Sequence, residues 1–179
     1  MSDTFAFTRA SPLAVKPGRY GADRGAPGVT LTVLHPQSLV MVIARSGKAK
    51  ATSEALATLR KIRVMWAGPE QYYVQGANAD DLARQLKGLA SIIDQSHGRV
   101  TIRIDGPKSR AALAKGTPVD LHADEFAVGA SAVTQMAHVG IHLTRVGENA
   151  FELSVFRGFS ESFWEWFTEM SLEFGYQVA

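Results

Sequence analysis

The densest group of titratable side chains in this sequence is Asp120, His122, Asp124 and Glu125, and it is the first candidate for chemistry. General acid–base or nucleophilic catalysis needs a nucleophile beside a base, or two carboxylates that share a cleft. This group follows a predicted helix and Pro118, where polar loops are expected. We therefore interpret it as a structural loop rather than an active site.

The histidines do not form a metal-binding pattern. His138 and His142 share one face of a strand predicted over residues 133–146, and at about 3.3 Å per residue they stand about 13 Å apart. That spacing is too wide for two ligands of one metal ion. The opposite face carries Ile141 and Leu143 and is typical of a core. The sequence therefore predicts a polar or interface role for the two histidines.

Composition excludes several other kinds of chemistry. The chain has 179 residues, 46% of them apolar and 20% charged, as in an ordinary soluble globular protein of one domain or two small ones. It has no cysteine, which excludes disulfides, thiolate nucleophiles and iron–sulfur clusters. Segment 45–48 (RSGK) is not a phosphate-binding loop, because Val42 and Ala49 replace the required glycine and hydroxyl residue.

Neither a nucleic acid nor a membrane is expected as a partner. Arg60, Lys61 and Arg63 lead toward Trp66, but a basic helix end beside a core strand explains this cluster equally well. The longest apolar run, residues 39–44, is far too short to span a bilayer, and the N-terminal residues lack the apolar region of a signal peptide. We therefore expect a cytoplasmic protein.

The elements that must position these side chains form an α+β pattern. After an N-terminal extended arm over residues 1–30, residues 31–92 and 93–179 form two halves, each with the order β-α-β-β-α, and we expect antiparallel sheets with packed helices. The predicted elements are strand 39–44, helix 49–62, strands 63–67 and 72–75, helix 80–90, strand 100–105, helix 107–115, strands 133–146 and 151–156, and helix 161–174.

Proline and glycine mark the ends of several elements. They interrupt any periodicity in the arm, which is either disordered or ordered by lying on another surface; in a free monomer we expect disorder. Gly116 is predicted to be a left-handed C-terminal cap of helix 107–115, with Pro118 preventing continuation. Charge also differs along the chain, because residues 1–92 carry a net charge of +6 and residues 93–179 a net charge of −4.

The last predicted helix combines a broad apolar face with an acidic row. Trp164 lies at one edge of the apolar stripe, and Ser160 is predicted to cap the helix. Glutamates recur every fourth residue with no basic residue between them, which is mildly destabilising. The row is either a solvated face or a surface that docks a protein, and both interpretations stay open. Its members are Glu161, Glu165, Glu169 and Glu173.

Several segments, taken in order, resemble the gamma subunit of heterotetrameric sarcosine oxidase. Residues 9–13 (RASPL) resemble the family's Arg-Ser-Pro-Leu arm, and residues 66–70 (WAGPE) its Leu-Gly-Pro-Asp-Glu-Trp segment. Residues 94–121 are similar to its strand, Gly-Pro turn and helix exit. The other similar segments are residues 126–134, with Phe126, Gly129 and Thr134, and the C-terminal helix from residue 159 to 166. Thr117 and Ser131 stand where family members often have cysteine.

This resemblance implies a noncatalytic subunit. The family's complex oxidatively demethylates sarcosine to glycine, with hydrogen peroxide and either formaldehyde or 5,10-methylenetetrahydrofolate as further products. FAD, FMN, NAD and tetrahydrofolate belong to the alpha, beta and delta partner subunits, and no cofactor, metal or catalytic residue is expected in this chain. The implied fold is like the folate-binding domain of the glycine-cleavage aminomethyltransferase. The candidate partner interface is Arg9, Pro12, Trp164, Glu165 and Glu169.

The alternative function is a freestanding folate-binding or one-carbon-transfer protein of the same fold. It differs from the subunit hypothesis in one measurable property, because a freestanding protein must bind its folate without partners.

Overall fold

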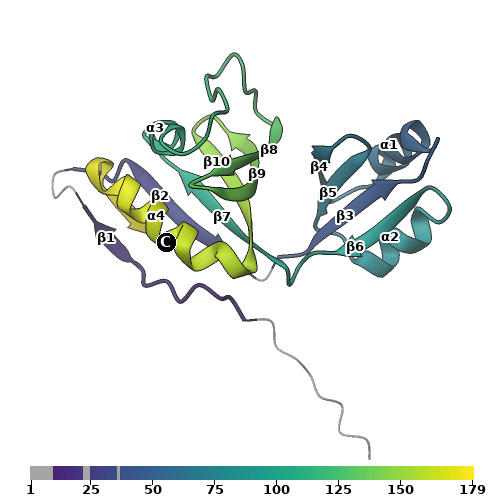
Figure 1. The fold of residues 1–179 in the computed structure, drawn as a ribbon, viewed down its shortest axis with the longest axis horizontal. Coiled ribbons are helices and arrows are strands. Elements are labelled where there is room, and N and C mark those ends of the chain that lie inside the picture. The colour runs from purple at the N-terminus through teal and green to yellow at the C-terminus, as the bar shows by residue number, and fades with distance from the viewer. Residues whose placement is uncertain (1–9, 22–24, 36) are drawn as a thin grey trace, which may run out of the picture.

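The protein has an α+β fold built on two β-sheets, which confirms the predicted class (Figure 1). The computed structural model describes residues 10–21, 25–35 and 37–179. In these residues one sheet has the strand order β1-β11-β2-β7-β10-β9-β8, and the other has the order β4-β5-β3-β6. Neighbouring strands are antiparallel, except that β11 runs parallel to β2.

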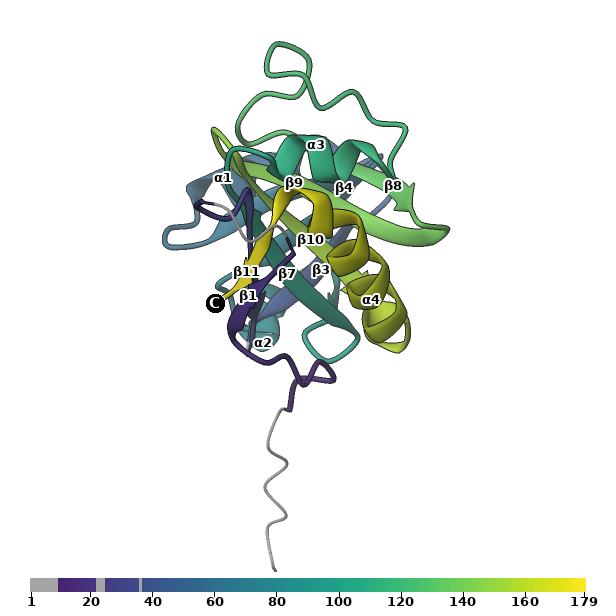
Figure 2. The same ribbon diagram turned by 90° about the vertical axis from the view of Figure 1, so that its left-hand side faces the viewer.

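The seven-stranded sheet packs its apolar face against α3 and α4. Strand alternation directs Ile104 of β7 and Leu153 of β10 to this face, where Phe163 and Phe167 of α4 join them in the main core. Figure 2 shows α4 crossing this face of the sheet. The elements are β1 (Gly18–Tyr20), β2 (Val29–Leu34), β7 (Arg99–Asp105), α3 (Ser109–Ala114), β8 (Ser131–Met136), β9 (Val139–Gly147), β10 (Ala150–Phe156), α4 (Ser160–Ser171) and β11 (Tyr176–Val178), with 3-10 helices at Arg157–Phe159 and Leu172–Phe174.

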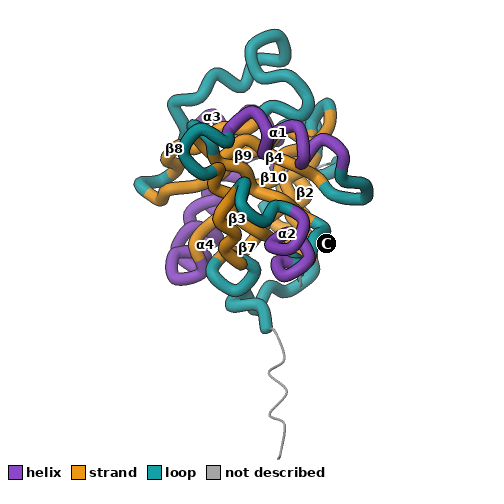
Figure 3. The backbone as a smooth tube through the Cα atoms, turned by 90° about the vertical axis from the view of Figure 1, so that its right-hand side faces the viewer, coloured by secondary structure: helices purple, strands orange, loops and turns teal. Residues whose placement is uncertain are grey.

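The four-stranded sheet packs against α1 and α2, which lie on its outer side (Figure 3). Val42 of β3 and Val74 of β5 are buried with Leu56 of α1 and Leu82 of α2 in a second, smaller core. The elements are β3 (Leu39–Ala44), α1 (Ala49–Thr58), β4 (Arg63–Gly68), β5 (Gln71–Gln75), α2 (Ala79–Gln85) and β6 (Ala90–Asp94).

The two sheets turn their remaining faces toward each other, so the helices lie on the outside of both layers. Met65 of β4 contacts Thr144 of β9, and Tyr73 of β5 contacts His142 of β9. We call this contact the inter-sheet seam. It is formed by Arg63, Met65, Tyr73, Gln75, Arg99, Arg103, His142, Thr144 and Glu152.

The chain crosses between the sheets before β3 and again after β6. Residues 31–34, which the prediction assigns to the first half, lie in β2 and pair with β7 of the second half. The four-stranded sheet is formed by residues 39–94. The division into halves at residues 31–92 and 93–179 stays a prediction.

The single strand predicted over residues 133–146 is wrong, because β8 and β9 form a hairpin there. Ala137 and His138 make the turn, with φ angles of 51° and 65°. Hairpin turns of this kind usually carry Asn-Gly or Asp-Gly, so Ala-His gives no turn signal in the sequence. The turn leaves His138 exposed, whereas His142 is buried in the inter-sheet seam.

Two predicted helix ends are also wrong. Gly116 does not have a positive φ; a Cβ atom there would lie 2.2 Å from the ring of Trp166, so close packing requires the glycine. Ser160 is the first residue of α4 and not its cap, since its hydroxyl donates to the carbonyl of Arg157 at 2.8 Å.

The described part of the arm lies on the chain's own surface, contrary to the disorder expected for a free monomer. Leu13 is 7% exposed and belongs to the main core. Arg157 Nη1 donates to the carbonyl of Ala10 at 3.1 Å, and β1 pairs with β11. The segment from residue 10 to residue 20 therefore joins the sheet that the C-terminal half forms.

Candidate functional site

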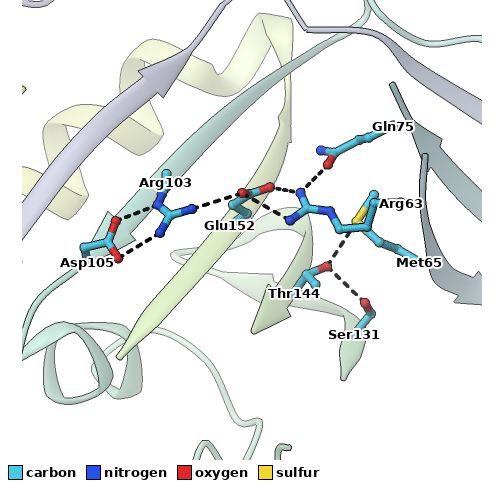
Figure 4. Close-up of polar contacts among 8 residues, drawn as sticks. All are labelled: Arg63, Met65, Gln75, Arg103, Asp105, Ser131, Thr144 and Glu152. Carbon is cyan, nitrogen blue, oxygen red and sulfur yellow. Dashed lines mark hydrogen bonds and ion pairs between the residues drawn. The ribbon is translucent and has the colours of Figure 1, made fainter. Parts of the chain in front are cut away.

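A line of charged side chains crosses the inter-sheet seam at Glu152 (Figure 4). Glu152 on β10 is 6% exposed and accepts from both terminal nitrogens of Arg63, a residue of the other sheet; the Nη1–Oε1 distance is 3.3 Å. Arg63 also donates to Gln75. Arg103 Nη1 lies 3.8 Å from Glu152 Oε1, and Arg103 binds both carboxylate oxygens of Asp105 at 2.6 and 3.2 Å. One buried carboxylate therefore links guanidinium groups of both sheets.

Hydroxyl and thioether groups continue the seam beside this ion pair (Figure 4). Thr144 Oγ1 donates to Met65 Sδ at 3.5 Å and lies 3.0 Å from the Ser131 hydroxyl oxygen. Neither hydroxyl has a base as its partner in these contacts, so this part of the seam packs the sheets together and does not resemble an activated nucleophile.

His142 joins the sheets as a neutral, buried group. Its Nε2 lies 2.8 Å from the carbonyl oxygen of Trp66, and its ring meets Tyr73 edge-on at a centroid distance of 5.0 Å. Burial lowers the pKa of His142; the hydrogen bond to Trp66 opposes this effect, and the positive charges of Arg99 and Arg63 add to it. At 3% exposure, the imidazole is placed to stabilise the seam rather than to exchange protons with a ligand.

Arg99 forms the end of the seam between two aromatic rings. Its guanidinium carbon lies 3.9 Å from the centroid of Phe156 and 5.1 Å from that of Tyr73. Burial lowers the pKa of Arg99, and burial also raises the pKa of Tyr73, an effect that Arg99 opposes. Such a stack orients the guanidinium by cation–π attraction and fixes the two sheets relative to each other.

The other predicted titratable sites lie outside the seam. Asp120, His122, Asp124 and Glu125 are exposed in the loop after α3, which agrees with their interpretation as a loop. Within the described residues, no group of three or more histidines and carboxylates is placed to hold a metal ion. No helix in the same part of the chain is long and apolar enough to cross a membrane.

The predicted interface residues do not share one environment. Glu165 and Glu169 are exposed on α4, whereas Trp164 is half-buried against the main core and Pro12 is half-buried in the arm. Arg9 lies outside the described residues. The two glutamates are therefore the members of the predicted set that the structure leaves open to a partner.

Reasoning from the sequence missed Glu152 and Arg103 as seam residues. A signal was present, because Glu152 and Ser154 alternate with Phe151 and Leu153 in a strand that is otherwise apolar. A charged residue within such a strand needs a partner across the buried face. The sequence did not indicate that this partner is Arg63, 89 residues away.

Comparison with known proteins relates this arrangement to one family. The family model of the sarcosine oxidase gamma subunit matches residues 24–173, which is most of the chain. The chain belongs to this family. The sequence resemblance is thereby confirmed, and the matched residues include α4 and every strand of the described residues except β1 and β11.

Curated members of the gamma subunit family are distant in sequence. The sarcosine oxidase subunit gamma of Corynebacterium sp. strain U-96 is 26% identical over 133 residues, which cover 72% of this chain and 65% of the relative. The sarcosine oxidase subunit gamma of Arthrobacter sp. is 25% identical over 134 residues, which cover 72% of this chain and 66% of the relative. The chain thus spans less than two thirds of the length of these gamma subunits.

Solved structures share the fold of this family member. A chain of the heterotetrameric sarcosine oxidase from Corynebacterium sp. U-96, solved with pyrrole 2-carboxylate, matches with a TM-score of 0.75 and 24% identity over 87% of this chain and 88% of that chain. Aminomethyltransferase T of the glycine cleavage system from Bartonella henselae matches with a TM-score of 0.63 and 16% identity over 86% of this chain and 48% of that chain. The predicted likeness to the aminomethyltransferase fold is confirmed.

Proposed function

We propose that this chain is the noncatalytic gamma subunit of a heterotetrameric sarcosine oxidase. The match to the gamma subunit family over residues 24–173 carries the proposal. The complex converts sarcosine to glycine and reduces oxygen to hydrogen peroxide, and the one-carbon unit leaves as formaldehyde or as 5,10-methylenetetrahydrofolate. That this chain and its complex lie in the cytoplasm stays a prediction.

The chemistry of the inter-sheet seam supports a structural role for this chain. Glu152 is engaged by two guanidinium groups, so it is not poised as a general base. His142 is neutral, buried and bonded to a backbone carbonyl. We therefore infer that alpha, beta and delta subunits supply FAD, FMN, NAD and the tetrahydrofolate site, and that Glu165 and Glu169 are among this chain's contacts with them.

Coexpression with larger flavin-bearing partners tests the subunit proposal. We expect the chain to copurify with them, and we expect sarcosine-dependent hydrogen peroxide production only from the complex. Purified alone, the chain should be colourless. An isolated chain that carries flavin, or that oxidises sarcosine unaided, would contradict the proposal.

A titration with tetrahydrofolate distinguishes the subunit proposal from the alternative that the chain is a freestanding folate-binding protein of the same fold. Isothermal calorimetry on the isolated chain should show no heat of binding at micromolar ligand. Micromolar binding by the lone chain would instead favour the freestanding protein.

A further inference from the structure

A groove with a volume of about 650 Å³ lies between α4, the end of α3 and the β8–β9 turn. Gly116 forms part of its floor, and the Trp166 ring is close enough that no side chain fits there. Trp166 and Val139 supply apolar surface, Phe163 is fully buried behind it, and Ser162 lies at the N-terminal end of the helix wall. The groove thus combines apolar surface with polar side chains, and α4 forms one of its walls.

The wall opposite α4 is held by a strained turn. Ala137 and His138, which both line the groove, adopt φ angles of 51° and 65°. Residues other than glycine rarely adopt this left-handed backbone conformation. Backbone strain of this kind concentrates where a protein needs a fixed shape, so the turn supports the view that the groove is preformed.

An acidic row borders the groove on α4. Ser162 and Trp166 line the groove. Glu165 is three residues after Ser162, and Glu169 is three residues after Trp166, so the two glutamates lie beside the lining residues on one side of the helix. Within the described residues, no ion pair involves Glu161, Glu165 or Glu169. Lys115, the cation in the groove, pairs with Glu173 at 2.5 Å. The rim therefore carries uncompensated negative charge.

We propose that this groove binds an extended, basic segment of a partner subunit; this inference rests on the proposed function. Glutamates four residues apart on a helix are separated by about 6 Å along its axis. Side chains on one face of an extended strand repeat at nearly the same interval, about 6.6 Å. The occupant therefore has lysine or arginine at alternate positions facing the glutamate row, and an apolar side chain that rests on Trp166.

Charge reversal on the intact chain tests the groove. Glu165→Lys with Glu169→Lys should weaken association with coexpressed partner subunits by about tenfold or more and flatten its dependence on salt. The matched control is Glu54→Lys with Glu125→Lys, which makes the same change of charge at exposed positions away from the groove and should change affinity less than about twofold. Circular dichroism establishes that both variants are folded.

Zero-length carbodiimide cross-linking of the wild-type complex identifies the occupant. We expect Glu165 and Glu169 to link to partner lysines that alternate within one extended segment. Equal association of the reversal variant and the wild type overturns the groove proposal and leaves the subunit proposal intact. The proposal is also overturned if the control variant weakens association with the partner subunits as much as the reversal variant does. It is likewise overturned if the wild-type chain self-associates and the reversal variant is monomeric. Failure of the wild-type chain to join any larger subunit contradicts the proposed function itself.

Discussion

At the scale of single residues, Glu152 joins the sheets because it is buried and faces guanidinium groups from both. Glu152→Gln keeps the size of the side chain but leaves Arg63 beside a neutral amide. Arg63 is partly exposed and recovers some hydration, so we expect a loss of about 1–3 kcal/mol in the free energy of unfolding. Urea denaturation measures this loss as a lower midpoint at unchanged slope.

The control for Glu152 is Glu54→Gln on α1, which breaks an exposed pair with Lys50 at 3.9 Å. Exposed pairs contribute little, so this change should stay within about 0.5 kcal/mol. If the two variants lose the same stability, Glu152 is not the link between the sheets.

His142 makes stability depend on pH. Its pKa is lowered in the folded protein, so the unfolded chain binds the proton at higher pH and is favoured by acid. The contribution of His142 to the free energy of unfolding should therefore be fully present above the ordinary histidine pKa of about 6.5. It should decline below that pH, by at most about 1.4 kcal/mol per pH unit for this one group. Urea midpoints from about pH 7 to pH 5 measure the decline.

A neutral replacement isolates the contribution of His142. His142→Gln retains an N–H donor for the Trp66 carbonyl and cannot titrate in this range, so its stability should fall less steeply with acid. Parallel pH profiles for His142→Gln and the wild type would show that other groups cause the decline.

Among the helices and strands, those with a clear local pattern of apolar residues are the ones that the sequence predicts. Strand 39–44 agrees with β3, because its apolar run is bounded by polar turns. The helix predicted over residues 80–90 ends at Gln85, since the chain must turn to begin β6 at Ala90. Strand β2, which begins in the last two residues of the predicted arm, was missed, although Val29, Leu31 and Val33 alternate with threonines. Prolines and glycines around it concealed a clear strand pattern.

Gly116 tests how α3 packs against α4. In Gly116→Ala the new methyl group would meet the Trp166 ring, so we expect the ring to move outward and stability to fall by about 1–3 kcal/mol. Tryptophan fluorescence should shift to the red, and the thermal midpoint should drop. Gly140→Ala, where an added Cβ meets nothing within 4 Å, is the control and should change neither signal. An unchanged spectrum for Gly116→Ala would contradict the close contact.

At the scale of the whole molecule, the order of the elements is visible in the sequence but their pairing is not. Periodicity shows which face of a strand is apolar, yet it carries no information on which distant strand lies beside it. Strand β1 near the N-terminus pairs with β11 at the C-terminus, and Leu13 inserts into a core formed by β2 and by residues 100–178. The same limit hid the seam, because its partners come from different sheets.

The attachment of the arm gives a prediction for the intact chain. Leu13→Ala removes a buried anchor, so the segment that contains β1 should detach more often, and stability should fall by about 1–3 kcal/mol. Trypsin can cut after Arg19 only when β1 separates from β11, so cleavage there should accelerate with the population of the detached form, about tenfold for each 1.4 kcal/mol by which detachment becomes easier. Ala14→Ser, at an exposed neighbouring position, should be cut at the wild-type rate. Rapid and equal cleavage of all three proteins would mean that the arm is not held by the core, and that the sheet ends at β11.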